Sequence, residues 1–76
     1  MATTLSISPS APPRLSRGER RTLQMLADGL SYRDIAAELG ILEAPIKTRM
    51  WTIRTKMGCD TTCMAVAAGF RRGLLR

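Results

Sequence analysis

The apolar residues of this chain recur at the spacing of α-helices, and no segment shows the alternation of a half-buried β-strand. Four helices are predicted, over about residues 17–28, 32–39, 43–57 and 62–72. The third has the most regular apolar stripe, with spacings of four, three and four residues: Ile46, Met50, Ile53 and Met57. The pattern therefore predicts an all-α fold.

Capping signals mark the ends of these helices. Ser16 and Glu19 have the S-x-x-E spacing of a capping box, and Ser31 with Asp34 repeats the device. A glycine closes each of the first three helices: Gly29, Gly40 and Gly58. The turn after the second helix has only three or four residues, a length that holds two helices at a steep angle. The second and third helices therefore have the arrangement of a helix-turn-helix.

The N-terminal segment differs from the rest of the chain. Residues 1–14 are rich in Ser, Thr, Ala and Pro, and their three prolines disfavour helix at the preceding positions. We therefore expect a flexible tail over residues 1–14 and one small domain over residues 15–76.

Positive charge is concentrated in the second half of the chain, whose formal net charge is +6. Residues 1–43 contain five basic and five acidic residues, whereas residues 44–76 contain seven basic residues and a single acid, Asp60. A charge excess of this kind favours a phosphate-rich partner. The surface that faces a polyanion is therefore expected after residue 43.

Membrane insertion and secretion are not expected for this sequence. No apolar run approaches the roughly 20 residues that a membrane-spanning helix needs. The N-terminus lacks the basic region, apolar stretch and cleavage site of a signal peptide. We therefore expect a cytoplasmic protein.

The residues for enzymatic or metal chemistry are missing. The chain has no histidine, and Cys59 and Cys63 are its only cysteines, so one chain cannot build a tetrahedral zinc site without carboxylates. The cysteines also lack a base partner, and no two acids are placed in an evident pocket. We expect a non-enzymatic protein with no cofactor and two reduced thiols. A redox role stays open, because Cys63 falls in the first turn of a helix, where a thiolate is favoured.

The outer face of the third predicted helix carries candidate DNA-binding residues. The major groove admits one helix, whose N-terminal outer face reaches the base edges. Lys47 can donate to guanine, and Thr48 can touch a thymine methyl or donate to a phosphate. Trp51 can pack against a sugar or a thymine methyl, or belong to the core or a dimer contact. Arg54 and Lys56 lie farther along and are expected at phosphates.

Two other surfaces are candidates for binding. Ser31, Tyr32 and Arg33 open the second helix, where amides and side-chain donors can hold a backbone phosphate. The last helix has a face of small residues that lets another helix approach closely: Ala65, Ala68 and Gly69. This face can form a homodimer contact, or it can pack inward.

The ordered set of these residues resembles the LuxR/GerE-type helix-turn-helix family from Leu15 to Leu75. The matching segments are Leu15-Ser16 with Glu19, ADGLS at 27–31, DIAAEL at 34–39, Gly40-Ile41, Glu43-Ala44, Ile46-Lys47-Thr48, Ile53, Lys56-Met57-Gly58, Ala65-Val66-Ala67 and Gly73-Leu74-Leu75. The resemblance implies a four-helix DNA-binding domain of a transcription regulator, which binds two half-sites as a dimer through its last helix. It also implies base-reading and phosphate-touching roles for Lys47 and Thr48. The chain is most similar in organisation to stand-alone, GerE-like members.

Four positions depart from the pattern of the family. Leu42 stands where the family usually has a capping serine, and Pro45 replaces a threonine. Arg49 replaces a common histidine, and Thr62 replaces a frequent phosphate-binding arginine. These changes indicate that affinity or target sequence differs from that of typical members.

Three functional hypotheses follow. The first is a sequence-specific transcription regulator that binds double-stranded DNA as a homodimer. The second is a protein-binding adaptor or antagonist that engages RNA polymerase or another regulator through the helix-turn-helix or the last helix. It is motivated by Leu42 and Thr62. The third, a promoter-binding module like region four of a σ factor, fits the spacing after Gly58 less well.

Overall fold

The computed structural model describes residues 14–76, so the predicted tail lies outside the described residues except for Arg14. Four helices form this part of the chain: α1 (Arg17–Ala27), α2 (Tyr32–Leu39), α3 (Glu43–Met57) and α4 (Thr62–Arg71). Each helix begins at the predicted residue, and α1 and α4 end one residue earlier than predicted. No strand occurs in residues 14–76. The prediction of an all-α, four-helix fold is confirmed.

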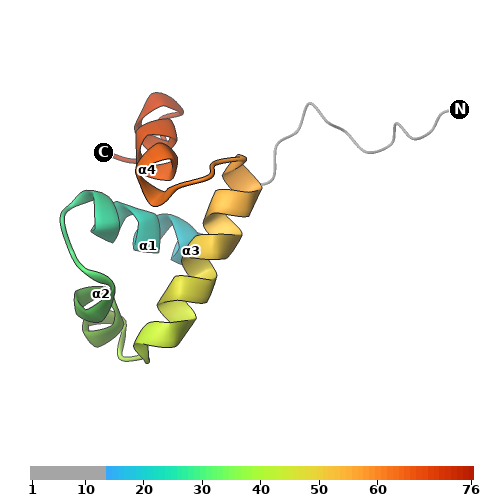
Figure 1. Ribbon diagram of the computed structural model, residues 1–76. Helices are drawn as coiled ribbons and strands as arrows, with labels where there is room; N and C mark the ends of the chain where they lie inside the picture. The colour runs from blue at the N-terminus through green and yellow to red at the C-terminus, as the bar shows by residue number, and fades with distance from the viewer. Residues whose placement is uncertain (1–13) are drawn as a thin grey trace, which may run out of the picture.

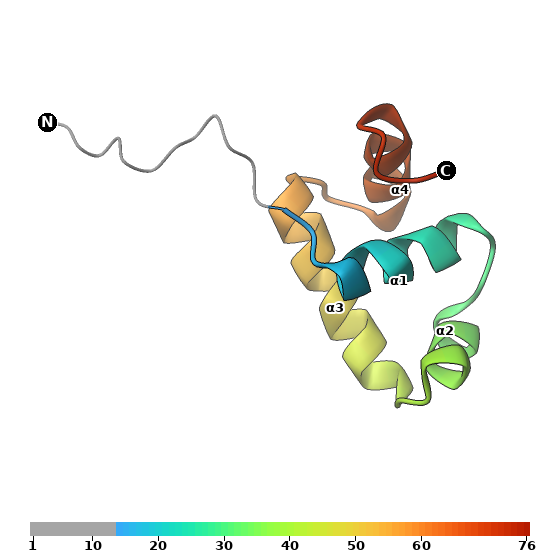
Figure 2. The ribbon, with the colours of Figure 1, turned by 180° about the vertical axis from the view of Figure 1, so that it is seen from behind.

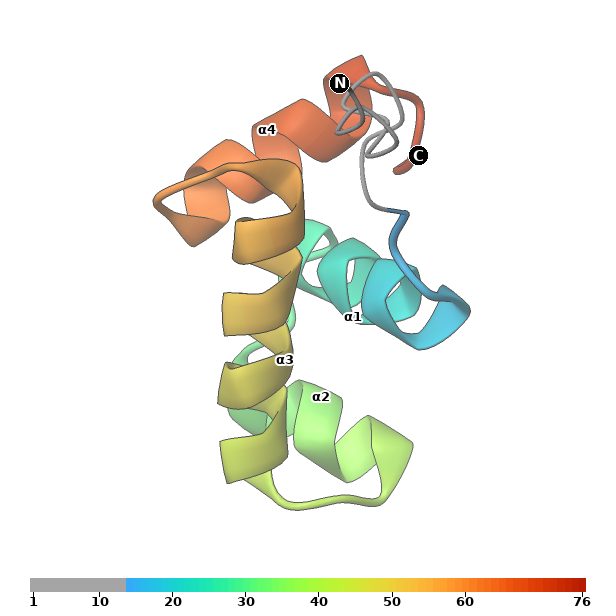
Figure 3. The ribbon, with the colours of Figure 1, turned by 90° about the vertical axis from the view of Figure 1, so that its right-hand side faces the viewer.

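The other three helices pack against one side of α3 (Figure 1). In Figure 3, α2 lies beside the N-terminal half of α3, α4 lies across its C-terminal end, and α1 is held between them. Seen from behind, the segment that precedes α1 starts beside the C-terminal end of α3 (Figure 2). One side of α3 is therefore left without a covering helix.

The predicted capping devices are present. The hydroxyl of Ser16 accepts from the amide of Glu19 at 3.1 Å, and the carboxylate of Glu19 accepts from the amide of Ser16 at 2.7 Å. Ser31 and Asp34 form the same pair of hydrogen bonds at the start of α2. Gly40 ends α2 with a φ of 69°, a conformation that other residues rarely adopt. These local contacts explain why the boundaries follow from the sequence.

Two hydrophobic clusters hold the helices together. The smaller joins α2 to the start of α3 through Ile35, Ala36 and Ile46. The larger joins α1, the rest of α3, α4 and the C-terminal segment, and its buried members are Leu15, Leu23, Met50, Ile53, Met57, Ala65, Ala68 and Leu75. The whole predicted inward stripe of α3 is buried. α3 is thus anchored along its full length.

The small residues of α4 belong to the larger cluster and its edge. Ala65 and Ala68 are at most 1% exposed, and Gly69 is also buried. A Cβ on Gly69 would lie 2.8 Å from the side chain of Leu75, so glycine lets the C-terminal segment fold back over α4. All three residues pack inward, so the dimer assignment of Ala65, Ala68 and Gly69 is corrected: their surface is used inside the domain.

An ion pair ties the first turn of α1 to the end of α3. The ammonium of Lys56 donates to Oε1 of Glu19 at 2.8 Å and reaches the carbonyl of Arg14 at 3.4 Å. Burial raises the pKa of Glu19, but the hydrogen bonds from Lys56 and Ser16 and the positive charge of Lys56 outweigh it, so the pKa lies below the ordinary value of 4.5. The carboxylate form is thus stabilised by folding.

We expect the domain to lose stability in acid partly through Glu19. Because its pKa is lower in the folded state, its contribution is present above pH 4.5 and is lost as pH falls through the folded pKa. Urea unfolding at a series of pH values should therefore show that the free energy of unfolding falls less steeply in acid for Glu19→Gln than for wild type. Glu38→Gln, which removes an exposed carboxylate from α2, is the control and should keep the wild-type slope. Equal slopes for Glu19→Gln and wild type would contradict the assignment.

Candidate nucleic-acid interface

The uncovered side of α3 presents the residues predicted to face DNA. Lys47, Thr48, Trp51 and Thr55 are all exposed, and Trp51 is 61% exposed although it is large and apolar. Thr48 and Thr55 lie opposite the buried stripe, and the helical spacing puts Trp51 and Lys47 beside them on the same outer face, with Lys47 toward one flank. The side of α3 available to a groove therefore begins with Lys47, one turn into the helix.

The start of α3 lacks a side-chain cap. Leu42 occupies the N-cap position without a capping hydrogen bond, and the residue is 78% exposed. Pro45 is accommodated because an amide in the first turn has no partner within the helix. The first turn of α3 therefore offers an apolar side chain where the family pattern usually offers a hydroxyl.

The first turn of α2 is partly used by its own capping box. The hydroxyl and amide of Ser31 are both engaged with Asp34. Tyr32 is half-buried and packs against both hydrophobic clusters, whereas Arg33 is exposed. Of the three residues predicted to hold a phosphate here, Arg33 is the one whose charge faces outward.

Arg54 and Lys56 have different surroundings from those expected for freely exposed phosphate contacts. Lys56 points toward α1, where Glu19 neutralises its charge. Arg54 turns to the other flank, and its Nη1 donates to the carbonyl of Asp60 at 2.9 Å. The prediction that both bind phosphate is therefore revised for Lys56, whose first role is structural.

Arg49 has a role that its sequence position did not reveal. Its Nη1 donates to the hydroxyl of Thr22 at 3.1 Å, and that hydroxyl in turn donates to the carbonyl of Gly18 at 2.9 Å. Thr22 is completely buried. Since i-to-i+4 periodicity describes only one helix at a time, no pattern in the sequence indicates this pair. The contact fixes the rotation of α3 against α1.

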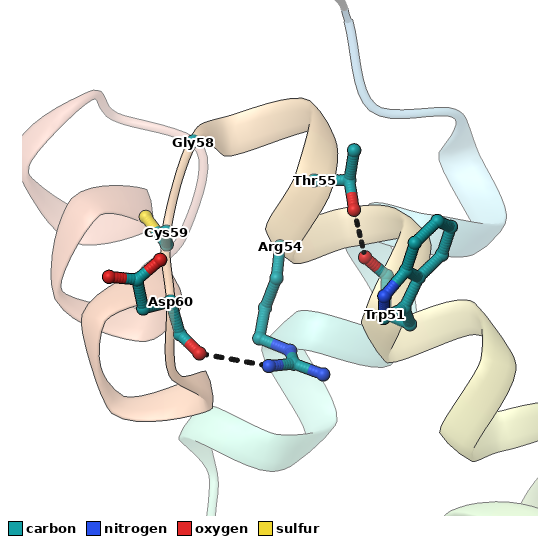
Figure 4. Close-up of a pocket in the computed structure, with 6 residues that line it drawn as sticks. All are labelled: Trp51, Arg54, Thr55, Gly58, Cys59 and Asp60. Atoms are coloured by element: carbon teal, nitrogen blue, oxygen red, sulfur yellow. Dashed lines mark hydrogen bonds between the residues drawn. The ribbon is translucent and has the colours of Figure 1, made fainter.

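A hollow opens between the C-terminal half of α3 and the α3–α4 turn (Figure 4). Its volume is about 360 Å³, and it is lined by Trp51, Arg54, Thr55, Gly58, Cys59 and Asp60. It adjoins the exposed face of α3 through Trp51 and Thr55. No sequence signal pointed to it, because its walls come from a helix and a turn that the fold brings together.

Other kinds of site are not found in the part of the chain that the structure describes. Within residues 14–76, no helix is long and apolar enough to cross a membrane. In the same residues no group of three or more His, Cys, Asp or Glu could hold a metal ion. Cys59 and Cys63 are both free thiols.

Comparison with known proteins decides the family. The sequence pattern of the GerE family, described as bacterial regulatory proteins of the luxR family, matches residues 13–68. The chain belongs to the luxR family. Its members include transcription regulators, and the domain that defines the family is a DNA-binding domain and not an enzyme domain. The chain thus contains a DNA-binding domain of the kind that transcription regulators use.

Named relatives of this luxR-family chain are regulators. It is 32% identical over 62 residues to the transcriptional regulatory protein YdfI of Bacillus subtilis (strain 168). It is 38% identical over 63 residues to the probable transcriptional regulatory protein NarL of Mycobacterium tuberculosis (strain H37Rv). These matches cover 82% and 83% of this chain but 29% of each relative. The chain therefore spans less than a third of the length of these relatives.

A solved structure has the same fold. The crystal structure of the response regulator ChrA of a heme-sensing two-component system superposes with a TM-score of 0.80 and is 35% identical in sequence. The match covers 93% of this chain and 35% of ChrA. The four-helix arrangement is therefore that of a luxR-type helix-turn-helix.

Proposed function

We propose that this luxR-family protein is a sequence-specific, cytoplasmic transcription regulator that acts as a homodimer and inserts α3 into the major groove. The observation that carries the proposal is the orientation of α3. Its buried stripe anchors it to the rest of the domain, while Lys47 and Thr48 project from the first two turns of the uncovered side. That is the geometry in which a helix reaches base edges.

The flanking groups support the same orientation. Arg33 is exposed in the first turn of α2, the helix that packs against the start of α3 through Ile35 and Ile46. The N-terminus of a helix and a guanidinium both favour an anion, so this corner suits a backbone phosphate beside the groove. Lys47 and Thr48 would then read bases while Arg33 sets the position of the domain on the duplex.

Selection of bound fragments from the source genome tests the proposal directly. We expect a common sequence motif with two related half-sites, bound about 10³-fold or more tightly than unrelated DNA. The logarithm of the binding constant should fall linearly with the logarithm of salt concentration, because bound phosphates release counterions. Binding to all fragments alike, at any salt concentration, would contradict sequence-specific regulation.

The outer face of α4 supports a dimer contact in place of the buried small residues. Cys63, Ala67 and Phe70 are exposed and Val66 is half-buried, and their spacing puts them on one apolar stripe. Phe70 is 47% exposed. We propose that this stripe, from Cys63 to Phe70, packs against its copy in a second protomer.

Phe70→Glu tests the proposed dimer. A carboxylate on the stripe would be desolvated in the contact, so we expect the dimer to dissociate and the affinity for a two-half-site operator to fall about 10- to 100-fold. Sedimentation velocity and binding to single and paired half-sites measure both effects. Arg71→Glu changes the adjacent exposed residue and is the control. Unchanged self-association of Phe70→Glu would remove this stripe from the interface.

The exposed Leu42 supports a second candidate function. An apolar side chain that is 78% exposed beside the half-exposed Ile41 suits a protein surface better than a phosphate. The alternative is an adaptor or antagonist that engages RNA polymerase or another regulator through the turn before α3. A stable complex with either protein, together with no shift of any DNA at low salt, would favour this alternative.

A further inference from the structure

Arg54, which lines the hollow beside the C-terminal half of α3, has a hydrogen-bond donor without an acceptor. Within residues 14–76, Nε of Arg54 is the one buried side-chain nitrogen or oxygen that lacks a hydrogen-bond partner. Buried polar groups in folded proteins are almost always paired, so an unpaired one calls for an explanation. Figure 4 shows the guanidinium between the α3–α4 turn and the indole of Trp51. The guanidinium therefore lines the hollow beside the exposed face of α3, while its Nε is enclosed.

The positive charge of Arg54 is also left without a counter-charge. Within residues 14–76 the guanidinium makes one hydrogen bond, from Nη1 to the neutral carbonyl of Asp60, and no carboxylate lies within ion-pair distance. In Figure 4 the carboxylate of Asp60 points away from the guanidinium. Lys56 differs in both respects, because Glu19 neutralises it. Arg54 thus combines a fixed geometry with a full charge, and its Nη2 has no acceptor among residues 14–76.

We infer that this hollow holds one phosphate of the DNA backbone, which accepts a hydrogen bond from Nη2 of Arg54 while the indole of Trp51 packs against the neighbouring sugar. The inference rests on the proposed function and adds to it a second fixed point on the duplex. Lys47 and Arg54 are seven residues apart, about 10 Å along the helix. A contact at each place sets the angle at which α3 lies in the groove.

The tether to Asp60 makes Arg54 a positioning residue. A free arginine loses side-chain entropy when it binds a phosphate, whereas this guanidinium is already held by the turn. The same tether couples the phosphate to the α3–α4 turn, which also carries Cys59 at the hollow. Asp60 itself places a negative charge at the rim, which weakens the binding of an anion.

Variants of these residues test the inference in the full chain. The probes are a duplex that carries a selected operator and a duplex of unrelated sequence, each titrated at several salt concentrations. We expect Arg54→Gln to lower the affinity for both duplexes by about tenfold. It should also reduce the slope of the logarithm of the binding constant against the logarithm of salt concentration by about 1. Asp60→Asn should raise the affinity for both duplexes a few-fold, because it removes the negative charge at the rim of the hollow. Arg71→Gln removes the same charge from the exposed end of α4 and should leave the slope unchanged.

Alkylation of Cys59 provides a measurement that needs no change in the hollow. In the wild-type chain, with the label on Cys59 separated from that on Cys63 by peptide mapping, the operator duplex should slow the reaction of Cys59 with iodoacetamide at least fivefold. Inorganic phosphate at millimolar concentration should leave the rate unchanged. Equal protection by inorganic phosphate would show a site for a free anion and overturn the assignment to the DNA backbone.

The outcomes separate this inference from the proposed function. If no duplex binds to the wild-type chain, the proposed function fails and the inference fails with it. If operator binding depends on Lys47 while neither the salt slope of Arg54→Gln nor the alkylation rate of Cys59 changes, only the inference fails. Thermal unfolding of Arg54→Gln near the wild-type midpoint confirms that a loss of binding does not come from unfolding.

Discussion

Alanine at position 47 is expected to lower the affinity for the selected operator by about 10- to 100-fold and to relax the sequence preference at one base pair. One specific contact of a basic side chain with guanine discriminates by about 1–3 kcal/mol. Lys47 is exposed, and it lies one turn from the start of a helix whose opposite face is buried. Its ammonium can therefore enter the groove without any rearrangement of the core.

Competition between operator variants, each with one base pair replaced, measures the effect. The wild-type chain should reject substitutions at the base pair that Lys47 contacts, and Lys47→Ala should accept them nearly equally. Arg33→Ala is the matched comparison, since a phosphate contact carries no sequence information and its loss weakens all duplexes alike. A Lys47→Ala chain that keeps full affinity and selectivity would exclude α3 as the reading helix in the proposed orientation.

Replacement of Ile53 by alanine should destabilise the domain by about 2–5 kcal/mol. Ile53 is completely buried in the larger cluster, where α3 meets α1 and α4. A domain of this size has a total stability of only about 3–9 kcal/mol, so the cavity left by alanine removes much of it. DNA binding should be lost at temperatures where the variant unfolds.

Urea unfolding followed by circular dichroism measures the loss, and two variants calibrate it. Ile53→Val keeps most of the side chain and should cost about 0.5–1.5 kcal/mol. Lys47→Ala changes an exposed position on the same helix and should stay within about 0.5 kcal/mol of wild type. A cost below about 1 kcal/mol for Ile53→Ala would mean that the interior around α3 is not packed as described.

The local features of this protein could be predicted from its sequence because they depend on neighbours along the chain. The capping boxes at Ser16 and Ser31 join residues three apart, and the glycine that ends α2 acts on its own backbone. The inward stripe of α3 follows from the period of the helix, since Ile46, Met50, Ile53 and Met57 share one face. The first residue of every helix, the buried face of α3 and the exposed position of Lys47 were therefore correct, and two helix ends differed by one residue.

The partners of the flanking side chains were decided only by the tertiary structure. Arg49 and Lys56 lie on the flank of α3 that meets α1, where they contact Thr22 and Glu19, residues 27 and 37 positions away. Arg54 lies on the opposite flank and is held by the turn before α4. Helical periodicity cannot distinguish these flanks, because it does not say on which side another helix lies.

The same reason explains the small face of α4 and the hollow. From sequence, Ala65, Ala68 and Gly69 suit either a partner helix or the interior, and the position of α1 and Leu75 places them in the interior. The hollow needs α3 and its following turn to meet at one angle, which the packing of α4 sets. The sequence by itself determined four helices and the face of α3 that can enter a groove. Only the packing of those helices, which depends on long-range burial, decided which charges remain available to bind DNA.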